Sequence, residues 1–374
     1  MKVFNTIPVD LDNQKYDIII GRGILANLSH LLSEQTKNRK VIIVSDSFFQ
    51  NTLGNTVKAQ LTENGFDCFE YYMNAGKENK NFNEVLKIYG ILEEHDFARD
   101  STLIALGGGV VGDLAGFVAS TWLRGMNLVH IPTTLLAMVD SSIGGKVAIN
   151  FRKTINGIGN YYHPIFNLID LDLVDTLPDR DLKSGLAEVI KCAIIDDKEL
   201  CAYLVENNQD ILARKEECIV KCIYDSIKIK IKYVSGDVRE GHKRLHLNYG
   251  HTLGHSIEIS TERNGKEQLR HGEGVSIGTI AVAHIADNYL KDVHTLEDYI
   301  GIFTLFDLPV FVDSQKLGFN REKLLNECIK NVNKDKKRIN NKLRLILSEK
   351  RGSASVYGDV PFDYVEEAFK YIIR

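Results

Sequence analysis

The pattern of hydrophobic and polar positions divides the chain into two halves of different character. Between Tyr16 and about Leu173, short apolar runs alternate with segments of helical periodicity. Short apolar runs bounded by turn residues are typical of buried parallel strands. Alternation of this kind predicts a doubly wound α/β domain, in which ligands bind beyond the carboxyl ends of the strands. The predicted strands are 16–20, 41–44, 103–106, 128–131 and 166–171, and the predicted helices are 24–32, 83–94 and 113–122.

After Pro178 the pattern becomes helical. Helices are predicted at 182–196, 198–213, 215–232, 251–261, 274–290, 295–302 and 321–331. Residues 227–232 read IKIKIK and alternate like a strand, but they continue a helical run from Glu216 without a turn residue, so we assign them to a helix. We therefore predict an α/β domain over residues 1–175 and a mostly α-helical domain over residues 176–374.

Three glycines, Gly107 to Gly109, follow the predicted strand 103–106 directly. Glycine has no Cβ, so the backbone can turn sharply and approach a ligand closely. A helix that begins behind such a turn presents free N–H groups to a phosphate; a tight turn without a ligand would explain the glycines equally well. Asp46, at the end of the strand 41–44, is either a helix N-cap or a ribose contact. The apolar stretch after the glycines is interrupted by polar residues that packing does not need, namely Asp113, Arg124, Thr133, Thr134, Asp140 and Lys146.

Composition narrows the class of protein. The chain has 374 residues and a formal net charge of −4, which does not suggest a nucleic-acid partner. No apolar run reaches the length of a membrane span, and residues 1–17 lack the apolar core of a signal peptide. Six cysteines without framework spacing indicate reduced thiols and a cytoplasmic protein. Cys218 and Cys222 lie one helical turn apart, which either helix packing or metal binding could explain.

The helical half contains one glutamate and three histidines that could bind a metal. Glu188 and Lys191 share a helix face, as do His251 and His255, and His271 follows in the next helical segment. Catalytic zinc sites commonly have three protein ligands of the His and Glu types and leave one position open. We assign Glu188, His251 and His271 to the metal and His255 to proton transfer, although spacing alone allows any three of the four as ligands. Glu188 and Lys191 could also be an ordinary ion pair.

Basic residues form a third group. Cations near a metal indicate a substrate with more than one negative group, such as a phosphate and a carboxylate. The run at 334–338 could instead be only a solvated surface. The group consists of Lys146, Lys191, Lys230, Arg244 and the run 334–338.

Several segments of the chain carry a resemblance to a known family. They are GGGVVGDLAGF, PTTLLAMVDSSIGGK, GLAEVIK, LNYGHTLGH and HGEGV. Together they resemble the 3-dehydroquinate synthase family of the sugar phosphate cyclases. The resemblance extends from about Tyr16 to Leu347, and it implies a Rossmann-like NAD-binding domain followed by a helical metal-binding domain, and a homodimer.

The resemblance also implies roles for individual residues. Zinc or cobalt would be bound by Glu188, His251 and His271, and Arg124 would bind the substrate phosphate in the neighbouring subunit. Substrate would contact Asp140, Lys146, Asn156, Lys191, Lys230, Arg244, Asn248, His255 and Lys336 or its neighbour. NAD would contact Asp46, Gly76, Lys77, Lys80, Gly108, Gly109, Val110, Gly112, Asp113, Thr133, Thr134, Leu136, Lys146, Leu173 and Thr176.

Two positions depart from the family pattern. Ile155 replaces a lysine that would contact the cofactor, and Lys77 replaces an acid expected near the ribose, with Glu78 beside it. At the substrate-reading positions, Asn248 and His255 resemble those of dehydroquinate synthases. The sequence thus favours a heptulosonate phosphate as substrate. The alternatives are an amino-dehydroquinate synthase, a cyclase similar to 2-deoxy-scyllo-inosose synthase, a metal-dependent polyol dehydrogenase, and a catalytically silent relative.

Overall fold

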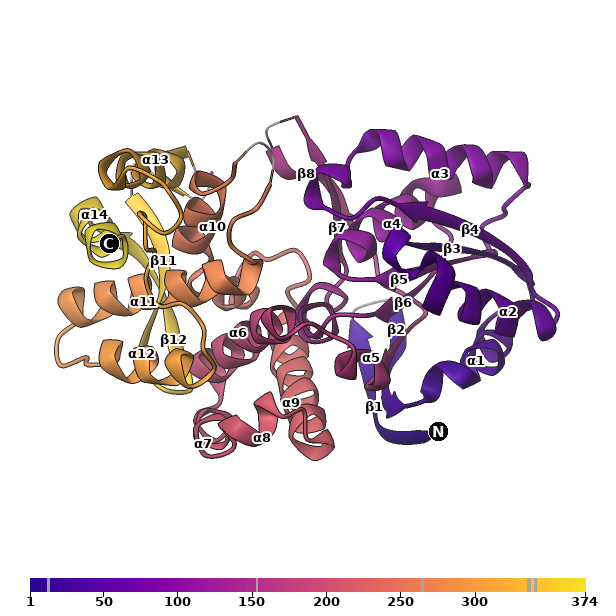
Figure 1. Cartoon of the computed structure of the whole chain (residues 1–374), viewed down its shortest axis with the longest axis horizontal. Helices are drawn as coiled ribbons and strands as arrows, with labels where there is room; N and C mark the ends of the chain where they lie inside the picture. Colours follow the sequence, from indigo (N-terminus) through magenta and orange to yellow (C-terminus); the bar gives the residue numbers. More distant parts are fainter. Residues whose placement is uncertain (12–13, 153, 264–265, 335–337, 340–341) are drawn as a thin grey trace. The chain divides into compact units, whose positions relative to one another are not determined.

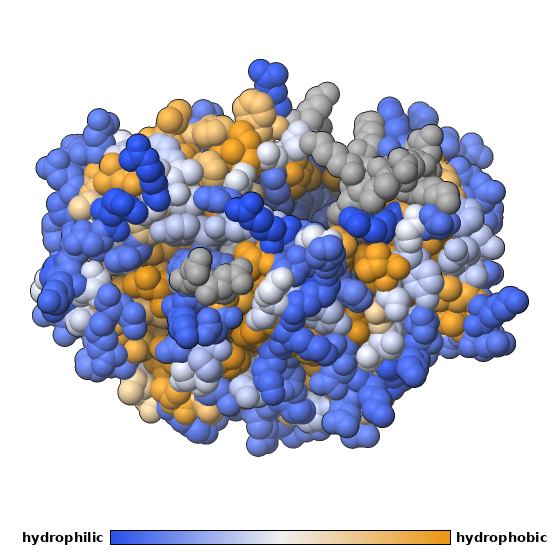
Figure 2. Space-filling model, turned by 180° about the vertical axis from the view of Figure 1, so that it is seen from behind, coloured by the Kyte–Doolittle hydropathy of each residue, from blue (hydrophilic) through white to orange (hydrophobic). Residues whose placement is uncertain are grey.

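The computed structural model describes residues 1–11, 14–152, 154–263, 266–334, 338–339 and 342–374. The chain divides into two compact units, Met1–Leu177 and Pro178–Arg374. The face in Figure 2 is mostly hydrophilic with separate hydrophobic patches, which is ordinary for a protein surface. Within the described ranges, no helix combines the length and the apolar character that a membrane span requires.

The first unit is built on one seven-stranded sheet with the order β1-β2-β9-β6-β5-β3-β4. β1 pairs antiparallel with β2, and the remaining neighbours are parallel. A separate antiparallel hairpin, β7–β8, packs on α4. The strands are β1 (Lys2–Leu11), β2 (Gln14–Arg22), β3 (Lys40–Asp46), β4 (Asp67–Met73), β5 (Thr102–Gly107), β6 (Asn127–Pro132), β7 (Lys146–Phe151), β8 (Thr154–Tyr161) and β9 (Phe166–Asp170).

Helices cover both faces of this sheet. Figure 1 shows α3 and α4 on one side and α1 and α2 on the other. The core between the sheet and α3 and α4 contains fully buried Ile42, Leu103, Leu114 and Ile88. The helices are α1 (Leu28–Gln35), α2 (Asn55–Glu63), α3 (Phe82–Glu94), α4 (Gly109–Thr121) and α5 (Asp172–Asp175), with short turns η1 (Ile24–Asn27), η2 (Ser47–Phe49), η3 (Gln50–Gly54), η4 (Lys77–Asn79), η5 (Trp122–Arg124) and η6 (Ala137–Ser141).

The strand order defines where a ligand crevice should lie. In the order of the strands, β4 lies beyond β3 in one direction, whereas β6 lies beyond β5 in the opposite direction. The chain therefore leaves the neighbouring strands β3 and β5 in opposite directions. Neighbouring parallel strands whose connections run in opposite directions form a topological switch point. Asp46 ends β3 and Gly107 ends β5, so both residues stand at this point.

The second unit is mostly helical, with α11 at its centre. α11 contacts α6, α10, α12, α14 and β11, and the antiparallel sheet β10-β11-β12 completes the unit. The elements are α6 (Asp179–Asp196), α7 (Lys198–Glu206), α8 (Asn208–Leu212), α9 (Glu216–Val234), η7 (Lys243–Asn248), α10 (His251–Ser260), α11 (His271–Tyr289), α12 (Leu296–Leu305), α13 (Arg321–Lys334), β10 (Arg338–Ile339), β11 (Lys342–Lys350), β12 (Ser353–Val360) and α14 (Phe362–Ile372).

The structure confirms the fold class and most of the predicted elements. The IKIKIK stretch lies inside α9, as expected. Several predicted boundaries were wrong. For example, α4 begins at Gly109 rather than Asp113, residues 24–32 form a 3₁₀ turn followed by α1, and 198–213 is interrupted at Asn207. The prediction also missed β1, β4, α2, the β7–β8 hairpin, β11, β12 and α14.

Candidate active site

The glycine turn joins β5 to α4 at the switch point. Gly108 is extended and caps α4, whose first residue is Gly109. A side chain would not fit here, because a Cβ on Gly107 would lie 2.7 Å from Val111 and one on Gly109 would lie 2.9 Å from Ser141 Oγ. The first turn of α4 therefore presents its free N–H groups on bare backbone, as phosphate-binding helices do.

The loop 76–80 is hydrogen-bonded to α4. Buried Lys80 donates from Nζ to Asp113 Oδ2, 2.6 Å away on α4, and also to Asn156 Oδ1 on β8. Asn150 reinforces the link, because its N–H donates to Lys80 O and its side-chain amide donates to Lys77 O. Three residues predicted to contact cofactor or substrate, Lys80, Asp113 and Asn156, are thus brought together by one ammonium group.

The other predicted residues of the first unit are spread around the carboxyl edge of the sheet. Asp46 caps η2, since its Oδ1 accepts the N–H of Phe48 at 2.8 Å; this is the N-cap role, and the ribose role stays a prediction. Thr133 and Thr134 directly follow β6, and the Cγ2 of Thr134 lies close to Gly108. The rest lie on α4 or on nearby turns, or at the first position of β7: Gly76, Lys77, Val110, Gly112, Leu136, Asp140, Lys146, Leu173 and Thr176.

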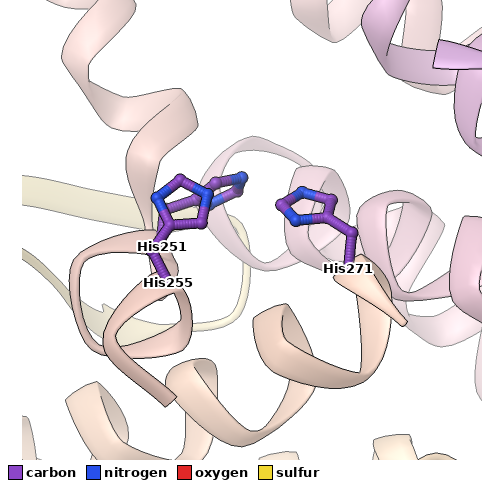
Figure 3. Close-up of side chains that lie close together, drawn as sticks. All are labelled: His251, His255 and His271. Carbon is purple, nitrogen blue, oxygen red and sulfur yellow. The ribbon is translucent and has the colours of Figure 1, made fainter. Parts of the chain in front are cut away.

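In the second unit, the three predicted histidines converge. Figure 3 shows the rings of His251 and His255, from α10, facing that of His271, from the start of α11. One nitrogen of each ring lies within 4.8 Å of the others. These three side chains could together hold a metal ion. Cys218 and Cys222 are free thiols outside this group.

Glu188, fully buried on α6, also faces this group. Its Oε1 lies 3.2 Å from His251 Nε2 and 3.4 Å from His271 Nε2. Ligand atoms that surround a zinc ion tetrahedrally at 2.0–2.2 Å are about 3.3 Å from one another. The two distances from Glu188 to the histidine nitrogens are therefore those expected between ligands of one zinc or cobalt ion, and His255 lies beside them.

The opposite ring nitrogens of the two histidines are occupied by acceptors. His251 Nδ1 lies 3.0 Å from Tyr249 O, and His271 Nδ1 lies 3.1 Å from Glu258 Oε1. Acceptors at Nδ1 direct the Nε2 lone pairs toward Glu188, which is how metal-binding histidines are oriented. Sequence reasoning missed Glu258, although it stands seven residues after His251 on the same helix face.

The electrostatics of the site favour a positive charge. Burial alone would raise the pKa of Glu188, but the charge of Lys191 and then the charge and hydrogen bond of His251 hold it well below its usual range. Burial would lower the pKa of His271, but the charge of Glu258 and hydrogen bonds to Glu188 and Glu258 raise it to about 10. The negative charges that stabilise the proton on His271 would also stabilise a divalent metal ion bound there in its place.

Glycines bring the three helices close enough to assemble the site. A Cβ on Gly254 would lie 2.6 Å from Gly274 O on α11, and one on Gly272 would lie 1.9 Å from Ser184 O on α6. Both glycines let backbone approach backbone, which keeps α10 close to α11 and α11 close to α6.

The predicted cations of this unit are buried. Lys191 pairs with Glu188 at 2.7 Å and donates to Leu247 O at 3.1 Å. Lys230 on α9 and Arg244 on η7 are 5% and 1% exposed. Burial of charges at this level is rare unless they serve a partner or a ligand. Lys336, also predicted to contact substrate, lies outside the described residues.

Comparison with known proteins follows the same division. Residues 70–184 match the family model described as 3-dehydroquinate synthase N-terminal, and residues 185–338 match 3-dehydroquinate synthase C-terminal. The chain is 39% identical over 359 residues to the 3-dehydroquinate synthase of Prochlorococcus marinus strain MIT 9312, covering 95% of this chain and 96% of that protein. It is 38% identical over 355 residues to that of Desulforamulus reducens, with the same coverage.

Solved structures of other cyclases share the fold. The 2-epi-5-epi-valiolone synthase of Streptomyces hygroscopicus, with NAD⁺ and Zn²⁺ bound, has a TM-score of 0.83 at 24% identity, covering 97% of this chain and 98% of that one. A 2-deoxy-scyllo-inosose synthase complexed with carbaglucose-6-phosphate, NAD⁺ and Co²⁺ has a TM-score of 0.82 at 23% identity, covering 98% and 99%. Family models that match most of the chain, and relatives of this identity over nearly its full length, show that the chain belongs to the 3-dehydroquinate synthase family.

Proposed function

We propose that the chain is a phosphate-eliminating cyclase, a carbon–oxygen lyase that converts 3-deoxy-arabino-heptulosonate 7-phosphate to 3-dehydroquinate and phosphate. One observation carries the proposal. Glu188 Oε1 lies 3.2 Å from His251 Nε2 and 3.4 Å from His271 Nε2, as ligands of one metal ion would, and buried Lys191, Lys230 and Arg244 belong to the same unit. Family membership supplies the reaction that uses such a set.

The first unit would bind NAD through the glycine turn and the loop 76–80, and the second would bind zinc or cobalt through Glu188, His251 and His271. When bound, NAD would supply the oxidation of one substrate hydroxyl and its later reversal, and the metal would polarise that hydroxyl. The resulting ketone would make the adjacent C–H acidic, so that phosphate could leave. After reduction of the ketone the sugar ring would open, and an intramolecular aldol reaction would close the carbocycle.

The residues of the chain would hold the substrate in one pose and move its protons. Lys191 and His255 would assist proton transfer, since both lie beside the donor set. Arg244 and Lys230 would bind the carboxylate of the substrate, and Asn248 would contact a hydroxyl group near that end. Because several steps follow one another in one site, a fixed pose contributes much of the rate enhancement.

Buried cations also favour a substrate that carries a carboxylate. Sedoheptulose 7-phosphate lacks this group and could not make the carboxylate contact with Arg244 and Lys230, which disfavours it. Ile155 is 51% exposed on β8, where the family has a lysine that contacts the cofactor. We expect NAD to bind more weakly than in relatives that keep the lysine.

The test is turnover by the purified chain with zinc or cobalt and a catalytic amount of NAD. We expect release of phosphate from the heptulosonate, formation of 3-dehydroquinate, and no net NADH. Phosphate release from sedoheptulose 7-phosphate but not from the heptulosonate would overturn the choice of substrate. NADH that accumulates with product would identify a polyol dehydrogenase instead.

We further propose a homodimer in which Arg124 serves the site of the neighbouring subunit. Arg124 is exposed at the end of η5, and both Leu123 (φ 48°) and Arg124 (φ 69°) adopt the left-handed conformation. Non-glycine residues pay about 1 kcal/mol or more for this conformation. A strained, exposed turn that projects a cation is consistent with a contact outside the subunit.

A further inference from the structure

The segment that joins α9 to η7 is folded around one carboxylate. Asp237 Oδ1 accepts the N–H of Gly241 at 2.7 Å, and its Oδ2 accepts the N–H groups of His242 at 2.8 Å and Arg244 at 2.9 Å. Burial would raise the pKa of Asp237, but the three backbone hydrogen bonds together hold it below its ordinary value. The carboxylate therefore remains charged at neutral pH and keeps all three donors.

This turn leads directly into the residues proposed to read the substrate. Arg244, the first residue whose side chain is buried after the turn, donates from Nη1 to Val238 O at 2.6 Å, back across the same turn. Glu240, which has a positive φ of 62°, accepts a hydrogen bond from Asn248 Nδ2. The backbone position of Arg244 and the side-chain orientation of both residues thus depend on how the segment 237–240 is folded.

The contact to Glu240 also fixes the orientation of the Asn248 amide. An ionised carboxylate can only accept hydrogen bonds, so the nitrogen of the amide must face it. Asn248 Oδ1 consequently points elsewhere and can accept a hydroxyl group. An amide that is held in this way is prepared to read a hydroxyl rather than an oxyanion.

The C-terminal end of η7 is held by a residue that also contacts the candidate metal site. Lys191 donates to Leu247 O, one residue before Asn248, and pairs with Glu188. Asp237 at one end of η7 and Lys191 at the other therefore set the place of Arg244 and Asn248 relative to the donor set of Glu188.

We propose that Asp237 is a positioning residue, which prepares Arg244 and Asn248 for the carboxylate end of the substrate by folding the turn before η7. The proposal rests on the proposed function, because that function assigns Arg244 and Asn248 to substrate. It adds the prediction that substrate recognition can be weakened from a residue that does not contact the substrate, while the metal site stays intact.

The variant that tests this is Asp237→Asn. Asparagine keeps the size of the side chain but presents an NH₂ group in place of one oxygen, so at least one backbone N–H faces another donor. The matched control is Asp287→Asn. Asp287 also binds two backbone N–H groups, those of Thr295 at 2.7 Å and Leu296 at 3.1 Å, and lies on α11 about 24 Å along the helix from His271.

Three measurements separate the outcomes. In the zinc-loaded enzyme we expect Asp237→Asn to raise KM for the heptulosonate by about tenfold with kcat within about threefold, and to leave zinc affinity unchanged. We expect hydrogen exchange of the backbone amides of residues 241–248 to become at least about tenfold faster than in wild type. Asp287→Asn should change none of the three.

The proposal would be overturned if Asp237→Asn had the same KM as the control, or if its amides exchanged at wild-type rates. It would also be overturned if Asp237→Asn lost zinc affinity by as large a factor as its KM rises. Hydrogen exchange needs no substrate, so it decides whether Asp237 holds the turn even in a chain that does not turn over the heptulosonate. Turnover by the wild-type enzyme tests the proposed function separately, so the two failures can be distinguished.

Discussion

Glu258 shows how one side chain outside the predicted ligand set can govern it. Its Oε1 accepts from His271 Nδ1 at 3.1 Å, and this contact orients the opposite nitrogen toward Glu188. Changing Glu258 to Ala removes the acceptor. Loss of such a partner typically lowers metal affinity about 10–100-fold, and we expect that loss for zinc, measured by competition with a chromophoric chelator.

The control for this change is Glu262→Ala, at an exposed position just beyond the same helix. It should leave zinc affinity as in wild type. Unchanged affinity in Glu258→Ala would mean that His271 is not a ligand, or that it is oriented by something else.

Lys80 illustrates a buried charge that is satisfied within the protein. Its side chain is 8% exposed and lies 2.6 Å from Asp113, which is 20% exposed. Lys80→Met would remove the ammonium group that pairs with Asp113 and Asn156, and we expect a loss of about 1–3 kcal/mol in the free energy of unfolding in urea. Adding Asp113→Asn should recover part of this loss. The single variant Asp113→Asn gives the reference. If it lowers the free energy of unfolding by the same amount in wild type and in Lys80→Met, the two side chains do not interact energetically.

His130 provides a pH dependence with a definite sign. It is buried on β6 beneath Gly112 of α4, and burial lowers its pKa from 6.5 to about 4. The unfolded chain therefore binds a proton at pH 5 that the folded chain does not, so stability is present above about pH 6.5 and is lost as the pH falls toward 4. Between pH 7 and pH 5 this single group accounts for about 2 kcal/mol.

His130→Leu should remove that part of the pH dependence, which urea unfolding at pH 7 and pH 5 would measure. The same substitution at His30, exposed on α1, should leave the difference between the two pH values as in wild type. A wild-type difference that persists in His130→Leu would show that other groups cause it.

At the scale of helices, the packing of α10 on α11 decides whether the histidines meet. Gly254→Ala would place a Cβ 2.6 Å from a backbone oxygen of α11, which cannot move aside as a flexible side chain can. The helices must separate, so we expect zinc affinity to fall by at least about tenfold and the free energy of unfolding to fall by about 1–3 kcal/mol.

Gly301→Ala on α12 is the matched control, because nothing lies within 4 Å of the added Cβ. Alanine is the better helix former, so this change should stabilise the protein by about 0.5–1 kcal/mol. Zinc affinity in Gly254→Ala equal to that in Gly301→Ala would show that the glycine contact does not set the histidine spacing.

Elements were predictable where one period dominated the sequence. The apolar runs of β3, β5 and β6 are buried on both faces, so they stand out as continuous stretches. β4 reads DCFEYYM and is only partly buried along the sheet edge, so its charged and polar residues concealed it. β8 has no such run because it is almost wholly exposed. β7 has none because its buried residues alternate with more exposed ones.

The candidate site was predictable as residue types but not as contacts. The spacing of His251 and His255 placed them on one helix face. The residue types suggested Glu188, His251 and His271 as ligands, and the resemblance implied the same three. No local pattern could show that Glu258 orients His271, or that Asp237 gathers three backbone N–H groups, because both depend on how separate segments fold against each other. Lys80 was expected to meet the cofactor, and its bridge between Asp113 and Asn156 was likewise invisible in the sequence.

At the scale of the whole molecule, the proposed dimer makes Arg124 a residue of one subunit and the metal donors residues of the other. Two inactive variants then complement each other. Arg124→Ala keeps its own donor set, and Glu188→Gln keeps Arg124, so a mixed dimer contains one complete site. Each variant alone should release little phosphate.

Co-expression of the two variants in equal amounts gives half mixed dimers if subunits associate at random, each with one of two sites intact. We expect about a quarter of wild-type phosphate release. The mixture of Lys183→Ala with Glu188→Gln provides the control, and should give about half of wild-type activity; Lys183 is a half-buried residue of α6 that pairs with Asp307. Sedimentation of the same preparations establishes that dimers are present. Dimers without complementation would mean that Arg124 serves its own subunit, and a monomer with full activity would remove the shared site altogether, because a cation supplied by a neighbour requires that neighbour to be bound.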